Sequence, residues 1–211
     1  MIYKTVDPSS LRLDPRELSA RMSIPVETEG EYFASGYEAL CSAASPGYVI
    51  RRTRIERDGD AIRIGRIKTE SRALGKVIGE ASECCLMVAT LGVQVDRLIL
   101  KRAEISPAEA FIIDALADAM AEALCDLAES EVSEAVGGRF SPGYADLELE
   151  VGAEIVALTE ADKRLGIRLT ESGLMVPKKS VSAIIPIKKD RVINSATEVK
   201  MHFTPGAWRI I

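Results

Sequence analysis

The chain has 211 residues, of which 47% are hydrophobic and 28% are charged, and its formal net charge is −5. This length suits one globular domain with a sizeable core. The acidic balance argues against nucleic acid as a partner, because proteins that bind nucleic acid carry a basic excess. We expect no membrane partner either, because no apolar stretch is long enough to span a bilayer and residues 1–8 do not resemble a signal peptide.

Cysteine and histidine usage excludes several kinds of catalytic site. The four cysteines, Cys41, Cys84, Cys85 and Cys125, include no Cys-x-x-Cys pair, so we expect no zinc site. Free cysteines indicate a reducing compartment, and we expect a cytoplasmic location. The one histidine, His202, has no nucleophile motif beside it and is interpreted as a half-buried strand residue. We therefore expect neither a catalytic side chain nor a metal ligand on this chain.

The N-terminal half predicts a short helix, a hairpin, a buried strand and two further helices. Asp14, Pro15 and Glu17 form the start of the short helix, with a cap, a first-turn proline and a capping-box acid. The other expected elements are a hairpin of strands 48–56 and 61–64, a helix over 69–83, a buried strand over 84–91 and a helix over 93–102.

The longest predicted helix begins after Ser106, where Ser106 to Glu109 form a capping box with proline at the first helical position. It is expected to run to about Val136, before two glycines. The later expected elements are a helix over 150–165 and strands over 167–169 and 180–185. Strands and helices alternate without a βαβ rhythm, which favours a mixed α+β domain.

The longest helix is strongly acidic. Residues 103–138 contain no lysine or arginine, and four acids recur at every fourth position, namely Asp114, Asp118, Glu122 and Asp126. Like charges at this spacing repel one another along one helix face. Two interpretations are open: a solvated acidic face, or a face on which one carboxylate meets a cationic ligand in a cleft. In either case a cation from elsewhere would stabilise the helix.

The first cation after this helix is Arg139, in the sequence Arg139-Phe-Ser-Pro-Gly-Tyr144. Its proline and glycine predict a turn with open backbone groups. A guanidinium can hold a carboxylate by two parallel hydrogen bonds, and a tyrosine offers a flat face and a hydroxyl. Such a loop suits a zwitterionic nucleoside amino acid, although most loops of this composition are ordinary turns.

This loop and the later sequence Leu169-Thr-Glu-Ser-Gly-Leu-Met-Val-Pro-Lys-Lys-Ser-Val-Ser182 together resemble the activation domain of vitamin B12-dependent methionine synthase. The acidic helix resembles the same family over residues 116–124. The resemblance implies one activation-like domain over residues 1–211, here as a stand-alone protein. Residues 1–68 match weakly, as an N-terminal helix and hairpin region, and residues 69–211 form the core.

The resemblance also implies a fold and a site. The fold is a C- or helmet-shaped α+β domain with a twisted antiparallel sheet flanked by helices. S-adenosylmethionine would lie in a shallow groove, with its carboxylate on Arg139 and its cationic side facing Glu122. Ser141 and Gly143 would give backbone contacts, and Tyr144 and Ser172 would also contact the ligand.

The function implied is the binding of S-adenosylmethionine and the presentation of its methyl group for reductive methylation of cob(II)alamin. The cobalamin would belong to a partner, either a B12-dependent methionine synthase or another corrinoid methyltransferase, and the chain would act as a component of that enzyme system. A flavodoxin-like or other protein would donate the electron. The alternative is a docking module for a corrinoid protein with a degenerate nucleotide site.

Two of the departures of the sequence from the family concern the backbone. Only Gly137 and Gly138 separate the acidic helix from Arg139, where the family has a long segment, and Pro186 stands where a glycine is common. Proline donates no ladder hydrogen bond, so we expect the strand to end or lie at a sheet edge there.

Three further groups of residues allow two interpretations each. Thr170, Glu171 and Ser172 either cap turns or contact the ligand. Lys178 and Lys179 are interpreted as a solvated loop, with docking to an acidic partner as the alternative. The same alternatives, a solvated face or a docking surface for a negatively charged electron donor, apply to the basic hairpin. Its basic residues are Arg51, Arg52, Arg54, Arg57, Arg63, Arg66 and Lys68.

Overall fold

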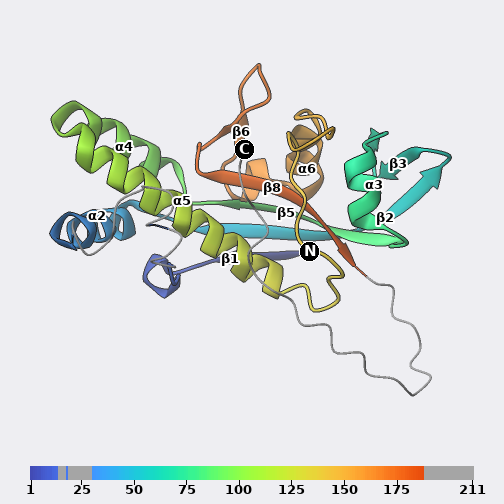
Figure 1. Cartoon of the computed structure of the whole chain (residues 1–211), viewed down its shortest axis with the longest axis horizontal. Helices are drawn as coiled ribbons and strands as arrows, with labels where there is room; N and C mark the ends of the chain where they lie inside the picture. Colours follow the sequence, from blue (N-terminus) through green and yellow to red (C-terminus); the bar gives the residue numbers. More distant parts are fainter. Residues whose placement is uncertain (14–17, 19–29, 188–211) are drawn as a thin grey trace.

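The structure is a computed structural model that describes residues 1–13, 18 and 30–187 (Figure 1). Its main sheet is antiparallel and consists of β1 (Ile2–Thr5), β2 (Gly47–Asp58), β3 (Ala61–Ile64), β4 (Ile67–Thr69), β5 (Glu83–Thr90) and β8 (Ser180–Ile187). The strand order is β4-β3-β2-β5-β8, and β1 pairs with β2. A small second sheet pairs β6 (Arg168–Leu169) with β7 (Met175–Val176).

Strand β2 is the long central strand of the main sheet and pairs along both of its edges. One of its edges pairs with β5 from Gly47 to Arg54, while the other pairs first with β1 and then, from Ile55 onward, with β3. The β2–β3 connection is a tight turn in which Gly59 has φ 61°, a conformation that glycine adopts without strain. The hairpin predicted from strands 48–56 and 61–64 is therefore confirmed.

Strand β5 is buried on both faces from Cys84 onward, which explains its apolar run from Cys84 to Ala89. Cys85, Met87 and Ala89 belong to the core cluster that packs under α2 (Gly30–Ala43), α4 (Val93–Ile105) and α5 (Pro107–Ser130). The alternate residues, Cys84, Leu86 and Val88, belong to the core cluster on the opposite face. That face is covered by α3 (Arg72–Ile78), α6 (Val151–Thr159) and α7 (Ala161–Arg164). A short 3-10 helix, η1 (Pro8–Ser10), completes the described elements.

This architecture confirms the expected mixed α+β fold with a twisted antiparallel sheet flanked by helices (Figure 1). The N-cap at Ser106 is confirmed, because the Ser106 hydroxyl accepts a hydrogen bond from the Glu109 amide at 3.4 Å. The reciprocal half of the predicted capping box does not form, because the Ser106 amide donates to the Arg102 carbonyl and Glu109 pairs with Arg102. Pro186 lies in β8, the last strand in the sheet order, as expected for an edge position. None of the helices in the described residues is long and apolar enough to cross a membrane.

Two of the predicted helices are shorter or interrupted in the structure. The helix predicted over 69–83 is only α3, because Thr69 pairs in β4, Ser71 caps the helix and Gly79 ends it with φ 46°. The helix predicted over 150–165 is interrupted at Glu160, whose φ is 57°.

Helix α5 ends at Ser130 rather than near Val136. Residues 131–140 instead turn toward the free edge of β8, where the Val136 amide bonds to the Pro186 carbonyl at 3.0 Å. Strands β1, β4 and β7 and helix α2 were not predicted. The helix predicted from Asp14 and the strand position predicted for His202 lie outside the described residues.

Candidate functional site

The acidic face of α5 meets two cations that come from distant parts of the chain. Lys179, in the turn before β8, places its Nζ 2.9 Å from Asp114 Oδ1 and 2.6 Å from Asp118 Oδ1. Arg139 forms ion pairs with the next two acids of the series, Glu122 and Asp126. The prediction that cations from outside the helix offset the repulsion along it is confirmed. The two cations are Lys179 and Arg139 of the same chain.

Arg139 holds three carboxylates of α5. Its Nη2 donates to Glu122 Oε2 at 2.5 Å, and its Nη1 donates to Asp126 Oδ1 at 2.7 Å and to Glu129 Oε2 at 2.9 Å. The backbone sets this direction. Phe140 exchanges two hydrogen bonds of 2.9 Å with Ile184 of β8 and is buried in the cluster under α6. Because successive side chains of an extended segment point to opposite faces, Arg139 points toward α5.

The surroundings keep Arg139 charged. Burial lowers the pKa of Arg139, but the adjacent Cys125 and the hydrogen-bonded and neighbouring carboxylates of Asp126 and Glu122 raise it, and the net shift is upward. Burial raises the pKa of the Cys125 thiol to about 12, so this neighbour is neutral at pH 7. We therefore attribute the upward shift of the Arg139 pKa to the carboxylates. The side chain of Arg139 is 20% exposed.

The loop after Arg139 is a tight turn, as predicted. Gly143 has φ 85°, and its amide donates to the Leu147 carbonyl at 2.8 Å. The amide of Tyr144 donates to the Ser141 carbonyl at 3.4 Å, and the Tyr144 side chain is 61% exposed. Since the Gly143 amide is already bonded within the turn, a backbone contact from Gly143 to a ligand would have to use its carbonyl oxygen.

A second turn lies beside this loop, between β6 and β7. The Thr170 hydroxyl accepts from the Leu174 amide at 3.1 Å and lies 2.9 Å from the Ser172 hydroxyl. A Cβ on Gly143 would lie 3.4 Å from Leu149 Cδ1, and one on Gly173 would lie 4.0 Å from Leu149 Cδ2. Leu149 therefore lies between the two turns, which the sequence separates by about 30 positions.

The predicted site residues thus form two groups. Glu122 and Arg139 are in direct contact, while Ser141, Gly143 and Tyr144 share one turn that faces the turn of Ser172 across Leu149. Within residues 30–187, no hydrogen bond or ion pair links the two groups. The capping interpretation of Thr170 is confirmed, whereas ligand contact by Ser172 stays a prediction.

Sequence reasoning missed several residues around this site. The interpretation of Lys179 as part of a solvated loop is wrong, because its side chain is only 12% exposed and pairs with α5. Burial lowers the pKa of Lys179, but hydrogen bonds to Asp114 and Asp118 raise it, and the net shift is upward. Asp126 and Glu129 were counted among the helix acids without a role. Their spacing from Glu122, by one and nearly two helical turns, placed them on the same face.

The basic hairpin is partly neutralised within the chain. Arg52 pairs with Glu83 at 2.5 Å and with Glu134 at 2.8 Å, and Arg66 pairs with Glu154. Arg51 donates to the Leu158 carbonyl at 2.5 Å. These contacts favour a solvated structural face over a docking surface for these members of the hairpin.

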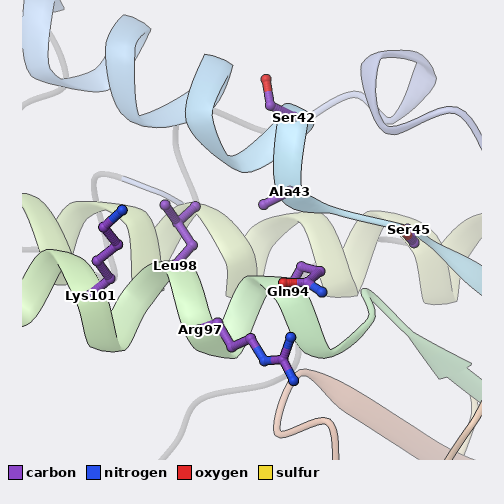
Figure 2. A pocket seen from close by; sticks show the side chains of 7 residues that line it. All are labelled: Ser42, Ala43, Ser45, Gln94, Arg97, Leu98 and Lys101. Atoms are coloured by element: carbon purple, nitrogen blue, oxygen red, sulfur yellow. The ribbon is translucent and has the colours of Figure 1, made fainter.

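Two hollows lie elsewhere on the described surface. One, of about 500 Å³, lies between α2 and α4 and is lined by Ser42, Ala43, Ser45, Gln94, Arg97, Leu98 and Lys101 (Figure 2). The other, of about 530 Å³, lies between α6, α7 and β6. Neither is lined by a predicted site residue.

Comparison with known proteins relates this geometry to one family. Residues 133–192 match the model of the activation domain of vitamin B12 dependent methionine synthase. Among solved structures, the MetH reactivation domain bound to AdoHcy matches with a TM-score of 0.70 and 21% sequence identity, over 94% of this chain and 81% of that one. The comparison with curated protein sequences gives no match. The chain thus resembles the activation domain of vitamin B12-dependent methionine synthase in sequence over residues 133–192, and it has the fold of the MetH reactivation domain over most of its length.

Proposed function

We propose that this chain binds S-adenosylmethionine and presents its methyl group for reductive methylation of the cob(II)alamin of a partner. The partner would be a B12-dependent methionine synthase or a related corrinoid methyltransferase. The observation that carries the proposal is the contact between Arg139 and Glu122, which places a carboxylate-binding group and a cation-binding group 2.5 Å apart. The family match over 133–192 and the fold of a domain solved with AdoHcy support it.

The two charged residues suit the two ends of the ligand's amino-acid part. Arg139 stays protonated, and its guanidinium can hold a carboxylate by parallel hydrogen bonds. Glu122 is 42% exposed, so its carboxylate can meet the ammonium or sulfonium group from the solvent side. When bound, S-adenosylmethionine supplies a methyl group on a positively charged sulfur.

The two turns around Leu149 suit the nucleoside part. Tyr144 offers an exposed aromatic face, and the Gly143 carbonyl and the Ser172 hydroxyl offer polar contacts. The methyl acceptor is the partner's metal centre, so the transfer needs no proton removal by this chain. The chain would contribute by positioning the methyl donor. This role needs no general base, which agrees with a sequence that has one histidine.

We further infer that the chain is a component of a methyltransferase system in the cytoplasm and takes part with a flavodoxin-like or other electron donor. Its cysteines support a reducing environment, because Cys84, Cys85 and Cys125 are buried and free and Cys41 is partly exposed and free. The partner and the electron donor follow from the family resemblance alone.

A second candidate function is a docking module with a degenerate nucleotide site. The observation that favours it is the pairing of Arg139 with three carboxylates of its own chain. In that case the pair would be a structural link between α5 and the following loop, and the chain would bind a corrinoid protein without binding the nucleotide.

Calorimetric titration with S-adenosylmethionine separates the two candidates. We expect measurable affinity for the native chain and a loss of about 10- to 100-fold in Arg139→Ala, the range typical of a charged hydrogen bond. Glu122→Gln should weaken binding by a smaller factor. Lys179→Met is the matched control, because it removes the other cation on α5 and leaves Arg139 in place. Absence of heat with millimolar ligand and folded native protein would favour the docking module.

A further inference from the structure

Arg139 has more negative partners than one guanidinium can neutralise. Glu122, Asp126 and Glu129 all bond to it, while Lys179 pairs with the two acids nearer the start of the helix. The cluster of these four residues therefore carries three negative charges and one positive charge. A fourth carboxylate that approached Arg139 would be repelled by the three already there.

Displacement of one of the three carboxylates would relieve this repulsion and free a donor of Arg139 for the carboxylate of a ligand. The exposed fractions of their side chains are 42% for Glu122, 69% for Asp126 and 23% for Glu129. Exposed ion pairs contribute little to stability, since solvent screens them and either charge is well hydrated once it is released. Asp126, which shares Nη1 with Glu129, costs the least to displace.

We propose that Asp126 occupies the position on Arg139 that the carboxylate of the ligand takes, and that its displacement sets the affinity of the site. This inference rests on the proposed binding of S-adenosylmethionine. Glu129, the least exposed of the three carboxylates, remains as the anchor of the guanidinium, and Glu122 remains toward the cationic end of the ligand. Asp126 is thus an affinity-determining residue that competes with the ligand from within the chain.

The test compares Asp126→Asn with Asp118→Asn in calorimetric titrations of the full chain. Both variants remove one negative charge from the same helix, but Asp118 pairs with Lys179 and not with Arg139. S-adenosylmethionine carries a net positive charge, so loss of a distant negative charge weakens its attraction. Displacement predicts the opposite sign for Asp126→Asn, an affinity about two- to fivefold higher than that of the native chain.

Decarboxylated S-adenosylmethionine is the second probe, because it lacks the group that would compete with Asp126. Asp126→Asn should bind this probe no more tightly than the native chain does. Thermal unfolding confirms that each variant is folded, and Asp126→Ser provides a second replacement. The inference is supported if the Asp126 variants bind S-adenosylmethionine more tightly than the native chain does but bind the decarboxylated probe no more tightly.

Two results overturn it, and they can be told apart. If the native chain binds S-adenosylmethionine and both Asp126 variants bind it equally or more weakly, the competition is absent while the proposed function stands. If neither the native chain nor the variants bind either probe, the proposed function fails and the inference fails with it.

Discussion

The Nη2 atom of Arg139 lies 2.5 Å from Oε2 of Glu122, a residue 17 positions earlier in the chain. The contact joins the loop that follows Gly138 to the middle of the longest helix. It places next to each other the two residues assigned to the carboxylate and to the cationic side of the ligand. The affinity of this site is therefore expected to depend on how the helix carboxylates share one guanidinium.

Lys179 should stabilise the fold. In Lys179→Met the carboxylates of Asp114 and Asp118 lose their cation, but both are partly exposed and can hydrate, so we expect a loss of about 1–2 kcal/mol in the free energy of unfolding. Urea denaturation at pH 7 measures it. The pKa of Lys179 is raised above its ordinary 10.5, so this stabilisation is complete below that pH and is lost as the pH rises through the folded-state value. A difference that grew with rising pH would contradict the assignment.

Asp146 should stabilise the start of α3 from a distant part of the chain. Its carboxylate accepts from the Ser71 hydroxyl at 2.6 Å and from the amides of Arg72 and Ala73 at 2.8 and 3.1 Å. We expect Asp146→Asn to lower the Tm by a few degrees, with Asp162→Asn on α7 as a surface control.

The pH dependence of this effect has a definite sign. The Ser71 hydroxyl, followed by the Arg72 amide, lowers the pKa of Asp146 below its ordinary 3.8. The stabilisation is therefore present above that ordinary value and is lost as the pH falls through the lower folded-state value. The Tm difference between the native chain and Asp146→Asn should shrink below about pH 4. A difference independent of pH would show that shape, rather than charge, is responsible.

Gly143 should be required for the turn that carries Tyr144. Its φ of 85° lies in the left-handed region, so Gly143→Ala introduces strain of about 1 kcal/mol. Gly138→Ala is the control, because a Cβ there meets nothing within 4 Å and its φ is not in that region. Differential scanning calorimetry should show destabilisation for the first variant alone. Equal Tm values for the two variants would mean that the turn does not need glycine.

The buried cysteines should resist alkylation in the folded chain. Burial raises the pKa of both Cys84 and Cys125 to about 12, so neither forms a thiolate at pH 8, and neither is accessible. Cys41 is partly exposed and should react first with iodoacetamide. Mass spectrometry of peptides after timed labelling measures the order. Early modification of Cys125 would contradict its burial beside Arg139.

The sequence predicted those elements whose signals are local. The N-cap at Ser106, the β2–β3 turn and the apolar run of β5 each depend on neighbouring residues, and all three are confirmed. The end of α5 was missed because its cause is not local. Residues after Ser130 leave the helix to bond the edge of β8, about 50 positions away.

The candidate site shows the same difference between local signals, which the sequence reveals, and contacts between distant residues, which it does not. The family resemblance identified Arg139 and Glu122, and the structure brings them together. The competing carboxylates of Asp126 and Glu129 could not be assigned from the sequence, because a helix with many acids does not show which of them a distant arginine will reach. The pairing of Lys179 with α5 was missed for the same reason, and a lysine pair in a loop was interpreted as solvated.

Methyl transfer in a reconstituted system tests the central claim most directly. The assay combines methyl-labelled S-adenosylmethionine, a reductant and a B12-dependent methionine synthase that lacks its own activation domain. We expect label on the cobalamin of the partner only when this chain is present, and a large loss of transfer with Arg139→Ala but not with Lys179→Met. Transfer that was equal with and without the chain, or that was unaffected by Arg139→Ala, would contradict the account.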